Sequence, residues 1–340
     1  MQKYRIFIFI ILMGIFQSFF FSGKKTTYTV GFYNVENLFD TIRNTNINDA
    51  DFTPDGKNHW DSKKYNIKLN NLSRVILGLG YGNAPAIVGM AEVENRQVLE
   101  DLIKTKNLAG KKYAVIHRNS KDERGIDVAA IYRTDVLKDL KYEYLEVVLP
   151  DKDDFTREIL YVKASMLGKY AVNIFYNHWP SRREGEAESE PKRIAAAKVL
   201  KAKIEEIKKK DANAVVFVMG DFNDEPNNKS IAEVLGAGKP GDKTKSLVNM
   251  SYAKFENKEG THSFKGEWNM LDQVMVSRSF YEKTKGLTLV QKETGIFKEP
   301  YVLFKHKDGG ISPNKSYSGP QFHAKGYSDH LAVYFSLEVK

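Results

Sequence analysis

Cysteine is absent from this chain of 340 residues. That absence excludes disulfide bonds, thiolate metal sites and a cysteine nucleophile. The sequence also lacks a glycine-rich fingerprint opening a helix after the first predicted strand, which disfavours a Rossmann fold. A phosphate-binding loop of the lysine-containing nucleotide type is missing as well. The chemistry of this protein must therefore come from carboxylates, amides, histidines and basic side chains.

The overall charge of the chain is basic. Lysine and arginine total 52 against 43 acidic residues, which gives a formal net charge of +9 at pH 7. Excess positive charge favours an anionic partner, although it says nothing about the fold. Because no internal repeat, low-complexity tract or interdomain linker interrupts the sequence, we expect residues 24–340 to form a single domain.

The first 23 residues differ from the rest in composition. Lys3 and Arg5 precede an apolar stretch over 6–21, and Ser22 and Gly23 follow it. Basic, apolar and small residues in this order are typical of a secretory signal, so we predict a signal peptide at 1–23 and export. An uncleaved membrane anchor is the alternative, but spanning a bilayer needs ~20 apolar residues and this run is shorter.

The central feature of the sequence is AVVFVMGDFNDEP at 214–226. An apolar run of this length, bounded by turn residues, indicates a strand buried on both faces. The run stops at Gly220, and Asp221 and Asn223 follow at once. A carboxylate and an amide would thus be held rigidly at the mouth of a core strand. The plainer interpretation is an ordinary turn, where Asp and Asn are common.

The same design recurs along the chain, because apolar segments repeatedly end at polar side chains. We predict strands over 28–35, 86–91, 113–117, 126–132, 160–166, 171–176, 214–219, 270–276 and 331–337. The longest helix is expected to begin near Pro191, with an apolar stripe running to Ile207. Many strands and few helices suggest an α/β fold in which two sheets pack face to face with helices outside.

The polar groups at these strand ends suit a hard cation. They are carboxylates, amides and two histidines, and oxygen ligands favour magnesium or manganese, whereas zinc would prefer more histidine. Such a cation stabilises negative charge on a phosphoryl oxygen. Asp272 lies inside an apolar run and needs a partner if it is buried, and histidine is the natural one.

Each of these residues also has an ordinary structural interpretation. Asp329 before His330 could cap a turn, and His178 beside Trp179 could simply pack in the core. Arg182 could be solvated on a loop, although a phosphate clamp suits a basic protein equally well. The remaining histidines lack comparable neighbours and are interpreted as surface or structural residues: His59, His117, His262, His306 and His323.

Seven motifs occur in an order that resembles the endonuclease/exonuclease/phosphatase superfamily. They are YNVEN at 33–37, GMAEVEN at 89–95, RNSKDER at 118–124, NHWPSR at 177–182, GDFND at 220–224, LDQVMVS at 271–277 and SDH at 328–330. The resemblance covers most of 28–338 and lies closest to the deoxyribonuclease and sphingomyelinase branches. It implies a four-layer α/β sandwich with two packed mixed sheets flanked by helices.

The resemblance also implies roles for individual residues. The metal would be held at Asn34, Glu36, Glu92 and Asp329. Catalysis would involve His178, Asp221, Asn223, Asp272, His330 and Glu123, with pairs formed by Asp272 and His330 and by Glu123 and His178. The substrate phosphate would be bound by Arg118, Asn119 and Arg182.

The functional hypothesis is an exported, monomeric phosphodiesterase that depends on Mg²⁺ or Mn²⁺. A nuclease acting on DNA or RNA comes first, because a basic surface binds backbone phosphates without reading sequence. A phospholipid or small-molecule phosphoesterase of the sphingomyelinase kind is the alternative within the enzyme class. The alternative from another class is a non-catalytic protein that offers a basic surface to DNA or lipid.

Overall fold

The computed structural model describes residues 26–340. The signal-peptide prediction for 1–23 therefore lies outside the described residues. Within 26–340, no helix combines the length and the apolar character that crossing a membrane requires.

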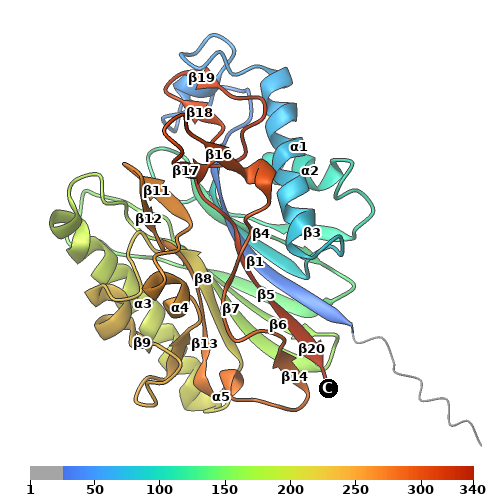
Figure 1. The fold of residues 1–340 in the computed structure, drawn as a ribbon, viewed down its shortest axis with the longest axis vertical. Helices are drawn as coiled ribbons and strands as arrows, with labels where there is room; N and C mark the ends of the chain where they lie inside the picture. Colours follow the sequence, from blue (N-terminus) through green and yellow to red (C-terminus); the bar gives the residue numbers. More distant parts are fainter. Residues whose placement is uncertain (1–25) are drawn as a thin grey trace, which may run out of the picture.

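Two seven-stranded sheets form the body of the molecule (Figure 1). The first sheet runs in the order β14 (Leu287–Leu289), β20 (Val333–Val339), β1 (Thr27–Leu38), β2 (Ile87–Val93), β4 (Asp127–Arg133) and β3 (Tyr113–Ile116), with β15 (Gly295–Ile296) also on β20. The second runs in the order β5 (Leu137–Leu145), β6 (Ile159–Met166), β7 (Tyr170–His178), β8 (Val216–Asp221), β13 (Asp272–Ser277), β10 (Leu247–Asn249) and β9 (Ala237–Gly238). Both sheets are mixed, since β1 and β2, and β7 and β8, are parallel while most neighbours are antiparallel.

The longer helices lie outside the two sheets, whereas Phe280 of a four-residue helix packs into the cluster between them. The helices are α1 (Ser62–Leu79), α2 (Arg96–Lys104), α3 (Glu186–Lys210), α4 (Tyr252–Glu256), α5 (Arg278–Tyr281), a π-helix (Ser230–Leu235) and two short 3₁₀ turns (Ala50–Phe52 and Pro300–Val302). Three small hairpins complete the fold: β11 (His262–Phe264) with β12 (Glu267–Asn269), β16 (Leu303–Lys305) with β17 (Ile311–Pro313), and β18 (Tyr317–Ser318) with β19 (Gln321–Phe322).

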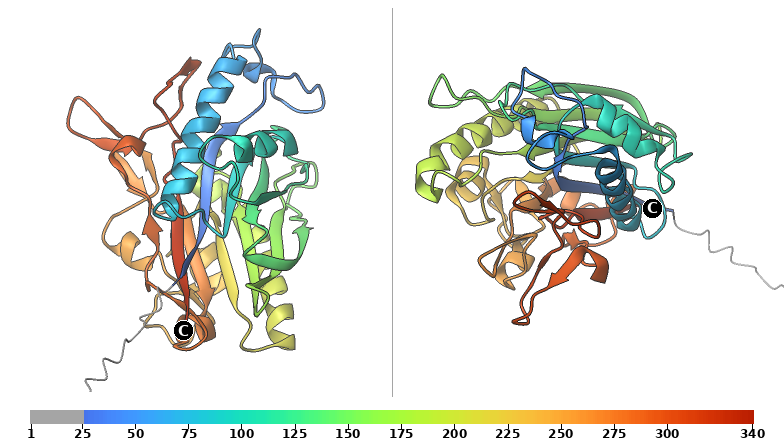
Figure 2. Two further views of the ribbon diagram at one scale, coloured as in Figure 1. Left: turned by 90° about the vertical axis from the view of Figure 1, so that its right-hand side faces the viewer. Right: turned by 90° about the horizontal axis from the view of Figure 1, so that it is seen from above.

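Figure 2 shows the sheets and helices from two further sides, and three clusters of buried apolar side chains hold these layers together. The central cluster lies between the two sheets and includes Phe32 and Phe217. A second cluster packs α1 and α2 on the outer face of the first sheet, and a third packs α3 on the outer face of the second. Helix, sheet, sheet and helix are thus stacked in order, and the predicted four-layer sandwich is confirmed.

The start of α3 differs from the sequence prediction. The helix begins at Glu186, so Pro191 lies inside it rather than in its first turn. Proline removes one intrahelical N–H donor. The carbonyl that loses its donor is that of Ala187, four residues before the proline. In the same turn the carbonyl of Glu186 accepts from the guanidinium of Arg193 at 2.8 Å, and the Ser189 hydroxyl donates to the carbonyl of Gly185. These side-chain bonds add to the first turn of the helix, which begins five residues before the proline.

The two sheets approach each other closely at Gly89 on β2. A Cβ atom at this position would lie 2.0 Å from the ring of Tyr176 on β7. Only a hydrogen fits there, so the two sheets approach each other more closely here than any side chain would permit. Because β2 also carries Glu92, this packing helps to fix the position of that carboxylate.

Replacing Gly89 by alanine is expected to destabilise the protein. The added methyl group must push the Tyr176 ring out of its place, and overpacking of this kind costs about 1–3 kcal/mol. Chemical denaturation of the variant measures the loss in the free energy of unfolding. Gly241→Ala is the matched control, because its Cβ would meet no atom within 4 Å. Equal midpoints for both variants would show that the sheets do not meet as described.

Candidate active site

Polar residues from both sheets meet at one end of the sandwich. Asn34 on β1 and Glu92 on β2 come from the first sheet. His178 ends β7, Asp221 ends β8 and Asp272 begins β13, all in the second sheet. Strand register places the last three side by side, since Asp221 pairs with His178 on one side and with Asp272 on the other. The predicted convergence of distant motifs is therefore observed.

Asp221 is the centre of this group. Only 2% of it is exposed, and its Oδ2 accepts from the Asn34 amide at 3.1 Å. The same oxygen lies 3.7 Å from Nε2 of His178 and 3.8 Å from Nε2 of His330. Its other oxygen accepts the backbone N–H of Asn223 at 2.9 Å. Burial raises the pKa of Asp221, and this carboxylate faces two imidazoles at once.

The predicted pair of His330 and Asp272 is present. Nδ1 of His330 lies 2.7 Å from Oδ2 of Asp272, and both side chains are buried. Burial alone would lower the pKa of His330, but the negative charges of Asp272 and Asp221 outweigh it and hold that pKa well above its ordinary value. His330 is therefore an imidazolium near neutral pH in the absence of a bound cation.

His178 has the opposite protonation. Burial, reinforced by the positive charges of Arg157 and Arg124, holds its pKa well below the ordinary value. Its Nδ1 is buried without a hydrogen-bond partner, while its Nε2 lies 4.0 Å from Oε1 of Glu92. The site thus combines a neutral and a charged imidazole, an arrangement that can separate acid and base roles.

The residues around Glu92 fit a hard divalent cation. Glu92 is partly exposed, and burial together with the charge of Asp329 raises the pKa of its carboxyl group. Two carboxylates in a partly desolvated site repel each other unless a positive charge lies between them. Oxygen ligands of this kind are those that magnesium and manganese prefer. Glu92 and Asp329 are thus candidate ligands for such a cation.

Asn34 contributes differently from the prediction. Its amide nitrogen faces Glu92 at 3.5 Å and Asp221 at 3.1 Å, while its Oδ1 accepts the N–H of Glu36. As it lies, the side chain bridges the carboxylates of the two sheets. A ligand role requires the amide oxygen to turn toward Glu92.

Glu36 is not free to serve as a metal ligand. One of its oxygens accepts from both the backbone N–H and the hydroxyl of Ser316 at 2.6 Å, and the other accepts from the N–H of Tyr317 at 3.3 Å. Burial and the charge of Asp329 raise its pKa to about 7. The buried amine of Lys68 donates to the same Ser316 hydroxyl. Glu36 therefore anchors the segment around 316 beside the site.

Arg182 is likewise not a phosphate clamp. Its guanidinium donates to the backbone oxygen of Asn223 at 2.5 Å and to side-chain oxygens of Asp224 and Asn228. With these acceptors occupied, Arg182 shapes the loop that follows β8. Asn223 is held by this loop and donates its own amide to the carbonyl of Trp179.

The loop over 118–124 also differs from its predicted role. Glu123 is exposed, makes no contact with His178, and the predicted pair between them is absent. Asn119 is exposed too, and Arg118 points to Glu158. The loop does bring an acidic and a basic side chain toward the site, but they are Asp122 and Arg124 rather than Glu123 and Arg118.

The buried residues of this region are Asp122, Arg157 and Arg124. Asp122 binds Arg157 at 2.9 Å, and both are almost fully buried. Arg157 also donates to the carbonyl of Trp179, next to His178. Arg124 is partly exposed, and its charge acts on Glu92 and His178. Arg124 belongs to the motif at 118–124, whereas no local pattern in the sequence marks Arg157.

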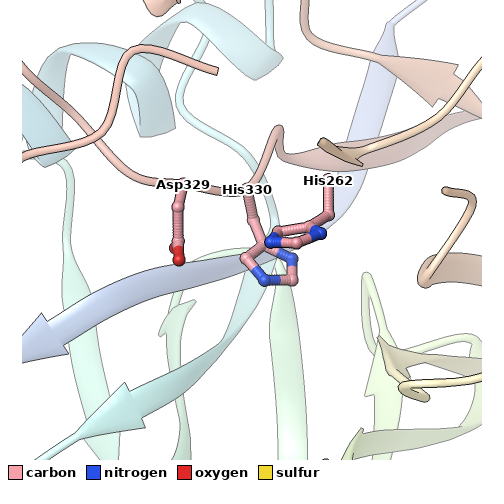
Figure 3. A group of neighbouring side chains, drawn as sticks. All are labelled: His262, Asp329 and His330. Carbon is pink, nitrogen blue, oxygen red and sulfur yellow. The ribbon is translucent and has the colours of Figure 1, made fainter. Parts of the chain in front are cut away.

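The prediction that His262 is a surface or structural residue is wrong, because the structure places its ring against that of His330. Its ring lies over that of His330, with centroids 4.8 Å apart (Figure 3). Ligand atoms of His262, His330 and Asp329 lie within 4.8 Å of one another. Burial and the charge of His330 lower the pKa of His262 to about 4. The hairpin of β11 and β12 brings it there, which sequence neighbours alone do not indicate.

Four residues at the site adopt a left-handed backbone conformation that is unusual for side chains other than glycine. They are Glu36 (φ 51°), Asn37 (φ 53°), Glu92 (φ 66°) and Asn223 (φ 50°). The pairing of β1 with β2 shifts register between Asn34 and Leu38, at the same place. Such strain persists only where surrounding contacts enforce it, and it gathers at functional sites.

Solved structures share this fold. An endonuclease/exonuclease/phosphatase family protein of Bacteroides thetaiotaomicron is 16% identical with a TM-score of 0.53, covering 93% of this chain and 99% of that one. A mannosyl-6-phosphatase from the same organism is 18% identical with a TM-score of 0.54, covering 91% and 99%. Zebrafish (D. rerio) TDP2 in complex with a single-strand DNA product is 14% identical with a TM-score of 0.53, covering 92% and 99%. At these identities the likeness establishes the fold alone.

The comparison with curated proteins gives no match. A family model, in contrast, matches residues 29–339, which is nearly the whole described chain. The superfamily inferred from the seven motifs is confirmed, as is the prediction of a hydrolase acting on phosphoester bonds. The chain therefore belongs to the Endonuclease/Exonuclease/phosphatase family, whose members are divalent-metal-dependent phosphoester hydrolases.

Proposed function

We propose that this protein is an exported phosphodiesterase that uses Mg²⁺ or Mn²⁺ and acts on nucleic acid. The observation that carries the proposal is the array of Asp272, His330 and Asp221 beside Glu92. It combines a charged imidazole, a buried carboxylate and a candidate cation ligand within one cluster. Phosphodiester hydrolysis without a covalent intermediate needs these three functions.

Glu92 and Asp329 would hold the cation, which when bound supplies Lewis-acid stabilisation of charge on a phosphoryl oxygen. Asp221 is placed to orient the attacking water and to accept its proton, since its carboxylate lies between the two sheets at the centre of the cluster. The water oxygen then forms the new bond to phosphorus as the bond to the leaving oxygen breaks. Asn223 supports this geometry through its backbone bond to Asp221.

His330 supplies positive charge to the reaction. The carboxylate of Asp272 fixes its ring and keeps it protonated, so Nε2 can donate to a phosphoryl oxygen. Preorganised donors of this kind stabilise the transition state because they need no reorganisation as charge develops. His178, which stays neutral, can bind the phosphate or assist the leaving oxygen from the other side of Asp221.

The basic character of the chain favours nucleic acid as substrate. The turn between β16 and β17 is formed by His306, Lys307, Asp308 and two glycines, while Phe304 and Ile311 on the strands next to it are about half exposed. The preference for nucleic acid therefore rests on the charge of the chain and not on this hairpin. One structural relative was solved with a DNA product, and another is a sugar phosphatase. The alternative substrate is a phospholipid or a small phosphoester, and assays on nucleic acid, sphingomyelin and simple phosphate esters distinguish these classes.

Export, a single domain over 24–340 and a monomeric state complete the proposal. The order of basic, apolar and small residues over 1–23 supports export. The extent of the family match supports one domain.

Replacing His330 by alanine tests the assignment. We expect turnover of plasmid DNA to fall by about 100- to 1,000-fold, as when one preorganised donor to a developing oxyanion is removed. Assays should compare magnesium, manganese, calcium and a chelator on plasmid DNA, RNA, sphingomyelin and simple phosphate esters. His59→Asn changes an exposed histidine that is not part of the described cluster, and it serves as control. Undiminished turnover of every substrate by the alanine variant would reject the site.

Arg124 is expected to contact the substrate phosphate, whereas Arg118 is not. Arg124→Ala should lower kcat/KM for a phosphodiester by about tenfold or more, the effect of losing one charged hydrogen bond. Arg118→Ala should change it by less than about twofold, because an exposed ion pair with Glu158 contributes little. Steady-state kinetics with the two variants decide between them, and equal effects would contradict the assignment.

The pKa of His330 should lie above the ordinary value for histidine, and the pKa of His178 should lie below it. A raised pKa keeps the proton on His330 as pH rises, and a lowered pKa keeps it off His178 as pH falls. NMR of ring nitrogens in chelator-treated protein at about pH 6.5, where an ordinary histidine is half charged, should therefore find His330 charged and His178 neutral. Asp272→Asn should lower the His330 pKa. Titration of both rings near pH 6.5 would refute the described electrostatics.

A further inference from the structure

A pocket of about 490 Å³ lies between the hairpin β16–β17 and the segment that carries β18 and β19. Phe304 and Pro313 contribute its apolar wall, and half of the Phe304 side chain is exposed. The ring of His306 stands edge-on to Phe304, with centroids 4.9 Å apart and an interplanar angle of 81°. The pocket therefore offers a flat, accessible aromatic face, which we call the hairpin pocket.

The polar lining of the hairpin pocket is basic. Lys315 and Lys325 line it, and no carboxylate does. Within 26–340, neither lysine forms a salt bridge, so both amines are free to meet an incoming anion. His306 and His323 are each fixed by a hydrogen bond from or to a serine hydroxyl, at 2.9 and 2.8 Å. Their rings are thus oriented before any ligand arrives.

The hairpin pocket lies beside the active site. Lys315 immediately precedes Ser316, which is bound at 2.6 Å by Glu36, two residues from Asn34. The hairpin β16–β17 also contacts β11, which carries His262. Figure 1 shows β16, β17, β18 and β19 gathered at the end of the molecule where β11 lies. A chain-like substrate at the catalytic cluster would pass near this pocket.

We propose that the hairpin pocket binds a nucleotide of the polynucleotide substrate that flanks the scissile phosphate. Its base would stack on Phe304, and its phosphate would lie between Lys315 and Lys325. Base–aromatic stacking next to a positively charged surface is the usual way to hold a single strand without reading its sequence. This inference rests on the proposed nuclease function and names a subsite for that activity.

The chemistry of the hairpin pocket disfavours an uncharged sugar as occupant. A sugar presents many hydroxyl donors, and a wall without carboxylates offers them few strong acceptors. A base with its phosphate instead matches the exposed ring and the two unpaired amines. The occupant is therefore anionic and carries a flat ring.

Binding of a fluorescein-labelled thymidine tetranucleotide, followed by anisotropy in the presence of chelator, tests this subsite without turnover. Phe304→Ala should weaken binding by about tenfold, in line with the loss of one stacked base. Phe304→Tyr should restore it. Lys325→Gln should reduce the slope of log affinity against log salt by about one. In turnover, Phe304→Ala should raise KM for an oligonucleotide, leave kcat unchanged, and leave hydrolysis of bis(p-nitrophenyl) phosphate unaffected.

Each control variant removes an aromatic ring or a lysine charge at a residue that does not line the hairpin pocket. Phe264→Ala deletes another exposed aromatic ring, and Lys307→Gln deletes a charge at the hairpin turn. Both should bind the tetranucleotide as the unmodified protein does. Equal binding by Phe304→Ala and Phe264→Ala would overturn the subsite. Binding that depends on Phe304, without cleavage of any nucleic acid, would support the subsite and overturn the nuclease proposal instead.

Discussion

The buried carboxylate of Asp221 links the two sheets of this protein at the catalytic end. It accepts a hydrogen bond from Asn34 of the first sheet and lies next to Asp272 across the neighbouring strand of its own sheet. A buried charge is tolerated only when donors or cations surround it. Two imidazoles lie near Asp221 and help to stabilise its buried charge. The contacts that make the buried carboxylate tolerable therefore also bring together the groups that hydrolysis needs.

The scaffold makes this assembly rigid. The site residues lie at or near the ends of core strands, and the sheets meet so closely at Gly89 that a methyl group would not fit. The packed strands hold the backbone of Glu92 and Asn223 in a left-handed conformation. Functional groups on rigid strands keep their geometry better than those on loops. The backbone strain thus lies at residues of the candidate active site.

Opposite charges are distributed around the site in a way that suits an anionic substrate and a cation together. Glu92 and Asp329 concentrate negative charge on one side. Arg157 and Arg124 bring positive charge to the side of His178, and Arg157 is neutralised by Asp122 while Arg124 remains partly exposed. A phosphate between these two sides would meet a cation and a guanidinium at once, which is the electrostatic basis of the proposed hydrolysis.

The sequence by itself determined the layered fold and the strand-end residues, because apolar runs that stop at Asp221 or Asp272 leave those carboxylates at fixed places. A buried Asp272 also called for a partner such as histidine, and the family resemblance, not the local pattern, named His330. Only the tertiary structure decided which way loop side chains point. In the loop over 118–124, Asp122 lies inward because it binds the buried Arg157, while Glu123 is exposed. His262 reaches the site through a hairpin whose position depends on contacts with residues distant in the chain, and no local pattern encodes such contacts.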